Sequence, residues 1–268
     1  MTRPYLSVIV PAYNEEHRIS DSVGQICTYL HQQPYPSELV VVDDGSSDAT
    51  PDMLRQLHAN HPELRVIQNE HRGKAVAVRT GVVAARGQLV LFIDADLPIP
   101  LEEIGRMVAA LEQGADVAIG SREGAGATRV GEPAHRHLMG RCFNTAVRLL
   151  LGQGFRDTQC GFKGFQAEAA RRLFAMSQLY TEQSPVLSRS AVTAFDVEIL
   201  FLAVREGMRI IELPVEWHYR PGSKVSPLAD SVSLFLDVVR IRWNALRGRY
   251  QGSGPAAERV EEATHARI

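Results

Sequence analysis

The sequence has few cysteines and no long apolar run, and both shortages narrow the class of protein. Its 268 residues include three cysteines, Cys27, Cys142 and Cys160, which form no CxxC pattern and cannot all pair. We therefore expect a reducing compartment, the cytoplasm, and no disulfide framework. No secretory signal opens the chain, and it contains no stretch of about 18 uninterrupted apolar residues. We expect no transmembrane helix, so a membrane substrate would be reached from the surface.

The chain also lacks a charge bias and the common nucleotide-binding and zinc motifs. Its 29 basic and 31 acidic residues give a net charge of −2, so nucleic acid is not expected as a partner. The absence of GxGxxG after the first predicted strand, and of any P-loop motif, argues against a dinucleotide oxidoreductase and a P-loop nucleotidase. No HExxH motif occurs, and the HxxH pair His58 and His61 falls at a helix end before Pro62. We therefore expect no histidine metal site.

Apolar, β-branched runs alternate with helical patterns through the first half of the chain. The predicted strands are residues 6–10, 39–42, 64–68, 89–93 and 117–119. The predicted helices are residues 15–33, 48–59, 74–85 and 102–113. This alternation predicts an α/β fold with a mostly parallel, Rossmann-like sheet flanked by helices.

The pattern changes after Gly120. Residues 123–132 are rich in glycine and alanine and predict a mobile loop. Further helices are predicted at 135–151, 195–205 and 230–249, and strands at 208–213 and 216–219. We find no repeat and no linker, so a single domain is expected over residues 1–250. The polar residues 251–268 are predicted to be a disordered tail.

Acidic or polar side chains follow three of the predicted strands. They are Tyr13-Asn14-Glu15, Asp43-Asp44, and Asp94 with Asp96. In open parallel sheets, ligands bind beyond the carboxyl ends of the strands, so these clusters predict a binding site. Tyr13 could stack on a base, and Asp43 or Asp44 could accept a hydrogen bond from a base N–H or a ribose hydroxyl.

Asp94 and Asp96 are spaced so that both carboxylates reach one hard cation. Mg²⁺ or Mn²⁺ is typically held by one or two carboxylates and by phosphate oxygens of the substrate. Such an ion neutralises a departing diphosphate. A DxD pattern alone is a weak signal, but its position directly after the apolar run LVLFI strengthens it.

An ordered set of motifs resembles the family 2 glycosyltransferases with the GT-A fold. In the first half these motifs are SVIVPAYNEE, VVDDGSSDAT, RGKAVAVRTG, LFIDADLP and IGSR. In the second half, DTQCGFK, AFDVE and GSK are similar to dolichyl-phosphate β-glucosyltransferases and their bacterial polyprenyl-phosphate relatives. The resemblance covers residues 5 to about 249, and it implies a nucleotide-sugar half at 1–122 and an acceptor half at 123–250, with C-terminal helices on the acceptor side.

The resemblance also implies roles for individual residues. The nucleotide-sugar site would comprise Pro11, Tyr13, Glu15, Asp43 or Asp44, Lys74, Asp94 and Arg122. Asp96, with Asp94, would ligate the metal. The acceptor or diphosphate side would comprise Arg136, Arg220, Ser223 and Lys224. Two departures are Ala75, where relatives often have glycine, and a longer segment at 180–193, which leaves the shape of the acceptor pocket open.

An inverting transfer requires in-line attack at the anomeric carbon. A sugar hydroxyl would need a general base, whereas a lipid phosphate is already anionic and needs positioning by arginine or lysine. Asp157 is the candidate base, with an Asx-turn before Cys160-Gly161 as an equal alternative. Asp196 and Glu198 could instead hold arginine or lysine partners, and Cys160 is interpreted as structural.

The C-terminal helix allows two interpretations. Its apolar positions are Val232, Phe235, Leu236, Val239, Trp243 and Leu246, with arginines among them. The helix could pack on the sheet, or its basic end could lie on an anionic membrane surface.

The leading hypothesis is glucose transfer from UDP-glucose to a polyprenyl phosphate, by an Mg²⁺- or Mn²⁺-dependent enzyme peripheral on the inner face of the membrane. The alternatives are mannose transfer from GDP-mannose, transfer to a soluble glycan or small acceptor, and a non-catalytic nucleotide-sugar-binding protein. Intact Asp94, Asp96, Arg122 and Lys224 argue against the last of these.

Overall fold

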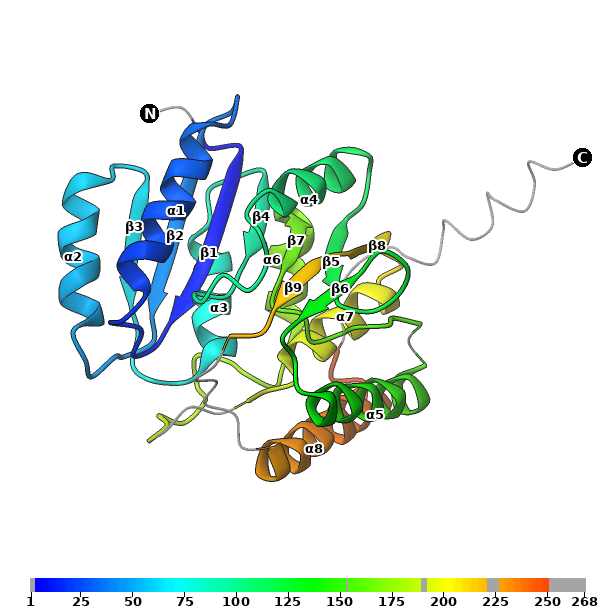
Figure 1. Ribbon diagram of the computed structural model, residues 1–268. Coiled ribbons are helices and arrows are strands. Elements are labelled where there is room, and N and C mark those ends of the chain that lie inside the picture. The colour runs from blue at the N-terminus through cyan, green and yellow to red at the C-terminus, as the bar shows by residue number, and fades with distance from the viewer. Residues whose placement is uncertain (1–2, 153, 189–191, 221–226, 251–268) are drawn as a thin grey trace, which may run out of the picture.

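The computed structural model describes residues 3–152, 154–188, 192–220 and 227–250. Its centre is a seven-stranded sheet in the order β3-β2-β1-β4-β7-β5-β8 (Figure 1). The strands are β1 Leu6–Ala12, β2 Ser37–Asp43, β3 Leu64–Gln68, β4 Leu89–Phe92, β5 Val117–Ser121, β7 Lys163–Gln166 and β8 Ile210–Pro214. All pairings are parallel except those of β7, which is antiparallel to β4 and β5. The predicted mostly parallel α/β fold is confirmed.

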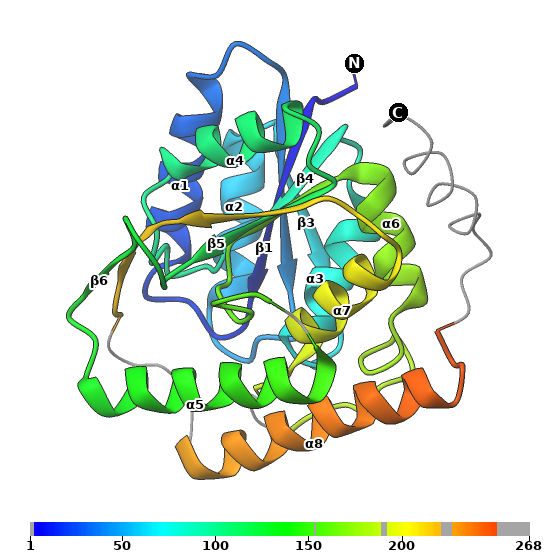
Figure 2. The ribbon, with the colours of Figure 1, turned by 90° about the vertical axis from the view of Figure 1, so that its right-hand side faces the viewer.

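Helices cover both faces of the sheet (Figures 1 and 2). One face carries α1 Ile19–His31, α2 Thr50–Asn60 and α4 Glu103–Glu112, and the other carries α3 Lys74–Ala84, α6 Ala167–Met176 and α7 Phe195–Arg205. Successive strand residues point to opposite faces, so Val8 and Val10 enter the core beneath α1 while Ile9 enters the core beneath α3. This explains why β1, β2 and β4, which have helices on both faces, are mostly apolar.

Two long helices form a further layer beyond the carboxyl ends of the strands. They are α5 Ala134–Leu151 and α8 Pro227–Leu246, which lie side by side along the lower edge in Figure 2. The segment predicted as a mobile loop, 123–132, contains β6 Thr128–Val130, which pairs with β9 Glu216–His218 in a small second sheet. Arg129 holds this segment through ion pairs with Glu123 and Glu132. The loop prediction was therefore wrong for this part of the segment.

Some boundaries also differ from prediction. The first helix begins at Ile19, not at residue 15, and both β7 and α6 were missed. β7 and β8 come from the predicted acceptor half and pair in the same sheet as strands of the predicted nucleotide half. The predicted tail, 251–268, lies outside the described residues. Among the helices that the structure describes, none is both long and apolar enough to cross a bilayer.

Candidate active site

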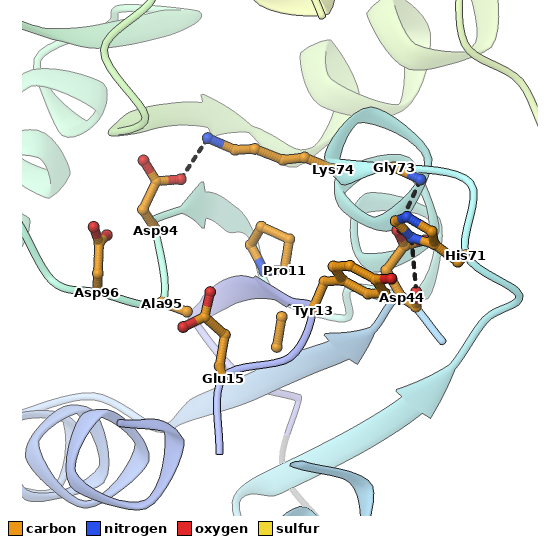
Figure 3. Close-up of a pocket in the computed structure, with 11 residues that line it drawn as sticks. Pro11, Tyr13, Glu15, Asp44, His71, Gly73, Lys74, Asp94, Ala95 and Asp96 are labelled. Carbon is orange, nitrogen blue, oxygen red and sulfur yellow. Dashed lines mark hydrogen bonds and ion pairs between the residues drawn. The ribbon is translucent and has the colours of Figure 1, made fainter. Parts of the chain in front are cut away.

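The ends of β1, β2 and β4 and the start of α3 surround a pocket of about 260 Å³ (Figure 3). Its lining residues end β1, follow β1, β2 or β4, or lie between β3 and the first turn of α3: Pro11, Ala12, Tyr13, Glu15, Asp44, His71, Gly73, Lys74, Asp94, Ala95 and Asp96. The structure thus brings together most of the residues expected at a nucleotide-sugar site. Asp43 and Arg122, which were also expected there, are not part of this lining.

The acidic end of the pocket carries more negative than positive charge. Lys74 forms an ion pair with Asp94 across the pocket (Figure 3). Burial and the nearby Asp94 carboxylate raise the pKa of Asp96. Burial lowers the pKa of Lys74, but the surrounding carboxylates, Asp94 foremost, outweigh it and the pKa is raised. A carboxylate whose ionisation is opposed by burial and by a neighbouring carboxylate suits a hard divalent cation, so the residues present fit the expected metal.

Arg18 was not predicted from the sequence, although it lies at the same end. Its Nε is 2.9 Å from Glu15 Oε2, and its Nη1 is 4.0 Å from Asp96 Oδ2. A basic residue in the turn between β1 and α1 is a weak signal by itself. Arg18 can be assigned to the site only from the fold, which brings the residues after β4 beside it.

The other end of the pocket is aromatic. The rings of Tyr13 and His71 stack with centroids 3.7 Å apart and planes 4° from parallel. His71 was not predicted, because one histidine in a loop gives no pattern. Asp44 fixes it: one carboxylate oxygen lies 2.7 Å from His71 Nδ1 and accepts the Gly73 N–H, and the other accepts the Arg72 N–H.

The aspartate that ends β2 and the one that follows it both form hydrogen bonds within the protein. Asp43 is buried, and its Oδ1 accepts the Ser46 N–H, which shapes the turn after the strand. Asp44 is buried as well and organises the loop before α3. A direct hydrogen bond from a base to Asp44 would therefore have to share an oxygen that already has protein partners, whereas the hydrogen bond described for Asp43 uses Oδ1.

Arg122 and Asp157 form a buried ion pair beside β5. Asp157 Oδ2 accepts hydrogen bonds from the Arg122 backbone N–H and from Nε, at 3.0 and 2.6 Å, while Oδ1 accepts one from Nη2 at 2.9 Å. Burial alone raises the pKa of Asp157, but Arg122 outweighs it and holds that pKa well below the usual range. The guanidinium carbon of Arg122 also lies 5.4 Å from the centroid of the Trp217 ring.

This environment argues against Asp157 as a general base. The side chain is fully buried, its oxygens are occupied by Arg122, and its low pKa makes it a poor proton acceptor. The Gln159 N–H also donates to Asp157 Oδ1, which is the bond of the Asx-turn considered as the alternative.

A second buried cation lies under the acidic end of the pocket. Lys163 in β7 is fully buried, donates to the Cys160 carbonyl, and its Nζ is 2.8 Å from Asp196 Oδ1 at the start of α7. Asp196 thus holds a lysine partner, as the sequence allowed. Glu198 accepts instead the backbone N–H groups of Gln178 and Leu179 and the Tyr250 hydroxyl.

Cys160 is buried between these two ion pairs. Burial and the Asp157 carboxylate raise the pKa of its thiol to about 12, as expected for an unreactive, structural cysteine. The glycine that follows it, Gly161, lies against Asp94: a Cβ atom at this position would overlap the Asp94 carboxylate.

The structure describes only some of the residues that were predicted to lie on the acceptor side. Arg220 donates to the Leu97 carbonyl at 3.3 Å and lines a second cavity of about 510 Å³ that also contains Arg18, Asp96 and His218. Asp96 therefore borders both cavities. Ser223 and Lys224 lie outside the described residues, and so does the side chain of Arg136.

The longer segment at 180–193 contacts the loop that carries His71. Within the described residues 180–188, the Leu187 N–H donates to the His71 carbonyl at 2.7 Å, and Arg72 donates to the Ser184 carbonyl. The Tyr180 hydroxyl bonds to Asp237 in α8. The segment thus links the rim of the pocket to the C-terminal helix.

Comparison with known proteins identifies the family to which these features belong. The model of glycosyl transferase family 2 matches residues 7–174, which include all of the pocket lining. The chain belongs to this family. It is a glycosyltransferase, and the site described above lies within the matched region.

The family's curated members include several that are similar over most of this chain. The dolichyl-phosphate beta-glucosyltransferase of Drosophila melanogaster is 35% identical over 92% of this chain and 77% of its own length. The Dictyostelium discoideum protein of the same name is 33% identical over 91% of this chain and 76% of its own length. The human one is 32% identical over 92% and 77%.

Solved glycosyltransferase structures share the fold. Glucosyl-3-phosphoglycerate synthase from Mycobacterium tuberculosis, crystallised with Mn²⁺, UDP and its product, superimposes with a TM-score of 0.60 at 20% identity, over 94% of this chain and 82% of that one. Staphylococcus aureus TarS in complex with UDP-GlcNAc gives a TM-score of 0.55 at 21% identity, over 89% and 65%. The Mn²⁺ and UDP of the mycobacterial structure are consistent with a divalent metal in this fold.

Proposed function

We propose that this glycosyltransferase transfers glucose from UDP-glucose to a polyprenyl phosphate of the dolichyl type, with inversion at the anomeric carbon. The observation that carries the proposal is the similarity, at 30–35% identity over 88–92% of the chain, to proteins named dolichyl-phosphate beta-glucosyltransferase. The pocket supports it, since it has an aromatic end for a nucleoside and an acidic end for a metal-bound diphosphate.

The donor fits the pocket in one direction. The uracil stacks at the Tyr13–His71 end, and the diphosphate lies at the Asp94–Asp96 end. Asp94 and Asp96 would hold Mg²⁺ or Mn²⁺, which supplies neutralising charge to the departing UDP. Lys74, already paired with Asp94, adds a positive charge on the opposite side. In this arrangement Asp44 acts indirectly, by fixing His71 and the loop before α3.

The reaction then needs positioning more than proton transfer. An acceptor phosphate oxygen attacks the anomeric carbon, the new C1–O bond forms on one face, and the C1–O bond to UDP breaks on the other. The phosphate is anionic at neutral pH, so no proton has to be removed first. This agrees with the buried, low-pKa environment of Asp157, whose role in the proposal is to hold Arg122 in place.

The acceptor approaches from the cavity on the far side of Asp96. That cavity carries the guanidinium groups of Arg18 and Arg220, which suit a phosphate head group. The same cavity is also lined by the carboxylates of Asp21, Asp96 and Glu102. Lys224, Ser223 and Arg136 are proposed to add to its two arginines. The cavity reaches the metal-binding carboxylate directly, as a nucleophile aimed at the donor requires.

The outer face of α8 provides a surface for the lipid. Its apolar side chains are exposed by 42% or more: Val232, Phe235, Leu236, Val239, Trp243 and Leu246. Leu234, Val238 and Ile241 are buried apolar residues of this helix and face the core. The sequence allowed this helix either to pack on the protein or to lie on a membrane. The buried residues just named do pack on the protein, whereas the apolar positions on which the packing prediction was based are exposed.

Exposed arginines accompany the apolar side chains on α8, among them Arg240 and Arg242. A helix with one face packed on protein and another of bulky apolar and basic residues suits a membrane interface. We place this face on the cytoplasmic leaflet, whose anionic lipids attract arginine by about 1 kcal/mol per residue. The enzyme would then be a peripheral membrane protein.

The test is a matrix of donors and acceptors. The full chain is incubated with UDP-glucose, UDP-GlcNAc, GDP-mannose and GDP-glucose, each with a short polyprenyl phosphate, a soluble glycan, or no acceptor. We expect glucosyl-phosphoryl-polyprenol to form from polyprenyl phosphate with UDP-glucose, and with none of the other three donors. Transfer from GDP-mannose would replace the donor assignment, and transfer only to the soluble glycan would replace the acceptor assignment.

A further inference from the structure

Four potential metal ligands meet at the amino ends of the strands, at the opposite end of the sheet from the donor pocket. Cys27 and His31 come from α1, and His61 and Glu63 come from the connection between α2 and β3. His31 Nε2 lies 3.1 Å from Glu63 Oε1, and His61 Nδ1 lies 3.4 Å from the same oxygen. The ligand atoms of Cys27, His61 and Glu63 are all within 4.8 Å of one another.

The local structure explains why these side chains converge. Cys27 and His31 are four residues apart, so they occupy the same face of α1. His61 is the C-cap residue of α2, and Glu63 immediately precedes β3. α1 and α2 pack side by side on one face of the sheet (Figure 1). No histidine metal site was expected from the sequence, because the members of this set are split between two segments. The HxxH spacing pairs His61 with His58, whose Nδ1 lies 2.6 Å from the Leu64 carbonyl.

Burial at this place is unusual for polar groups. Cys27 is fully buried. Both carboxylate oxygens of Glu63 are inaccessible, and among the described residues neither accepts a hydrogen bond of good geometry, although two imidazole nitrogens lie within 3.4 Å. Burial alone raises the pKa of Glu63, but its own backbone N–H, the Cys27 thiol and His31 outweigh burial and lower that pKa, so these groups are the carboxylate's partners. Buried polar atoms are normally well satisfied, and a cation bound among these groups would give the oxygens a partner of better geometry.

We propose that Cys27, His31, His61 and Glu63 bind one Zn²⁺ ion as a structural site. One thiolate, two imidazoles and one carboxylate form a four-coordinate zinc ligand set. Metal–ligand bonds of about 2.0–2.3 Å in a tetrahedron place ligand atoms about 3.3–3.8 Å apart. The separations of the two imidazole nitrogens from Glu63 Oε1, 3.1 and 3.4 Å, are close to this. Cys27, His61 and Glu63 form the compact part of the set, and the exposed His31 side chain would have to turn toward Cys27 and His61 to complete it. The thiolate selects zinc over the Mg²⁺ or Mn²⁺ that the carboxylates at the donor pocket favour.

The ion would fasten the end of α1 to the start of β3. The other end of the same helix follows the turn that carries Glu15 and Arg18 at the donor pocket. The zinc site would therefore stabilise the scaffold of the active site without taking part in the transfer. The competing arrangement is a metal-free cluster, in which burial and the Glu63 carboxylate raise the pKa of Cys27 to about 12 and keep it a neutral thiol.

Cobalt separates these two arrangements. The purified full chain is stripped with a chelator and titrated with Co²⁺ while the absorption spectrum is recorded. We expect a near-ultraviolet sulfur-to-cobalt charge-transfer band that saturates at one equivalent and disappears when Zn²⁺ is added. The band is expected to persist in Cys142→Ser, which removes an exposed cysteine, and to be lost in Cys27→Ser. No band, or an undiminished band in Cys27→Ser, would overturn the proposal.

Histidine variants test the site without disturbing the core. His31 is 62% exposed, so His31→Ala is expected to fold normally. Its zinc affinity should fall at least as much as the about 10–100-fold that loss of an outer-shell partner costs, because His31 is proposed as a direct ligand. Zinc should raise the melting temperature of wild type and of His17→Ala, whose side chain is 91% exposed, but raise it much less in His31→Ala and His61→Ala. An equal rise in all four proteins would assign the effect to another site and contradict the proposal.

The effect of the zinc site has to be distinguished from that of the metal at the donor pocket. Asp96→Asn should leave the cobalt band and the zinc-dependent rise in melting temperature unchanged, because Asp96 lies at the other end of the sheet. Loss of both in Asp96→Asn would show that the thermal effect belongs to the active site, and the zinc proposal would fail while the proposed transfer reaction would stand.

Discussion

Gly161 lies so close to Asp94 that a side chain at position 161 would occupy the space of the Asp94 carboxylate. The two residues come from different parts of the sequence: Asp94 lies just beyond β4, and Gly161 lies in the polar segment before β7. That segment also carries Asp157, which pairs with Arg122, and it leads into Lys163 of β7, which pairs with Asp196. This part of the chain thus helps to position the side chains at the acidic end of the pocket.

We expect Gly161→Ala to lose activity while the fold survives. The added methyl group displaces Asp94, and a misplacement of about 1 Å at a reacting centre costs about 100-fold in rate. The measurement is kcat/KM for UDP-glucose beside the melting temperature. Gly24→Ala is the matched control, because nothing lies within 4 Å of a Cβ atom there and alanine suits α1. Near wild-type kcat/KM in Gly161→Ala would contradict the contact.

Activity is expected to require a divalent cation held by the carboxylates after β4. Asp96→Asn should reduce kcat by orders of magnitude, because it removes a charged ligand from the diphosphate side. Its melting temperature should stay near that of wild type. EDTA should abolish turnover in wild type, and Mg²⁺ or Mn²⁺ should restore it. Asp52→Asn, which removes an exposed carboxylate on α2, should behave as wild type. Full turnover in EDTA would disprove the requirement.

The Tyr13–His71 stack should determine nucleotide affinity. Stacking of a base on an aromatic side chain contributes about 1–3 kcal/mol, so Tyr13→Ala should weaken UDP binding by about tenfold or more. His71→Ala should weaken it too, because it removes the ring that supports Tyr13 and the partner of Asp44. Calorimetry should show UDP binding tighter than GDP in wild type. Because the rings contact each other, the double variant should lose less than the sum of the single losses.

The Arg122–Asp157 pair should contribute to stability in a pH-dependent way. Asp157→Asn leaves Arg122 without its counter-charge, and breaking a buried pair costs about 3 kcal/mol in the free energy of unfolding. The pKa of Asp157 is lowered on folding, so its contribution is present above the ordinary carboxyl pKa of about 4 and is lost as the pH falls below it. Urea unfolding should therefore show a difference from wild type that narrows as the medium is acidified.

Asp52→Asn is again the control for that measurement. Asp52 pairs with Arg55 on the surface of α2, where both side chains are exposed, and such pairs contribute less than about 1 kcal/mol. A loss in Asp157→Asn no larger than in this control would mean that the buried pair does not stabilise the fold.

The sequence predicted best where short-range patterns decide the structure. The strands from β1 to β5 are apolar runs closed by polar residues, so both their existence and their shared edge could be inferred. β7 could not, because Lys163 is charged and is buried only through Asp196, more than thirty residues later in the chain. The role of Asp157 was undecided for the same reason, since its partner Arg122 is contributed by the end of β5.

The spacing of apolar residues in the sequence also did not identify which face of α8 packs against the protein. Apolar residues lie on two sides of this helix, so the same spacing fits Val232, Phe235 and Val239 as well as Leu234, Val238 and Ile241. Only the position of α8 relative to α5 and the core decides between them. The set chosen from the sequence proved to be the exposed one.

That exposed face of α8 leads to the last prediction, on membrane binding. Phe235→Glu with Trp243→Glu replaces two exposed apolar side chains by charges that anionic lipid repels. Both side chains are about half exposed, so the fold should tolerate the change. The wild-type protein is expected to co-sediment with anionic liposomes at low salt and to be partly released from them at high salt. The double variant should remain in the supernatant. The arginine contribution is screened by salt, whereas the apolar contribution is not.

Kinetics give the sharper criterion for the same variant. Its turnover with a short, water-soluble polyprenyl phosphate should equal that of wild type, because the donor pocket lies elsewhere, while turnover with a long polyprenyl phosphate in liposomes should fall. Val83→Glu on α3 is the matched control, because Val83 is 66% exposed but is not part of α8. Lys224→Ala should raise the KM for the acceptor more than that for the donor in both formats, because it removes a head-group contact and leaves the membrane face intact. Equal liposome binding by wild type and the double variant would contradict the role of α8, and a change confined to donor affinity in Lys224→Ala would move that residue from the acceptor side to the nucleotide side.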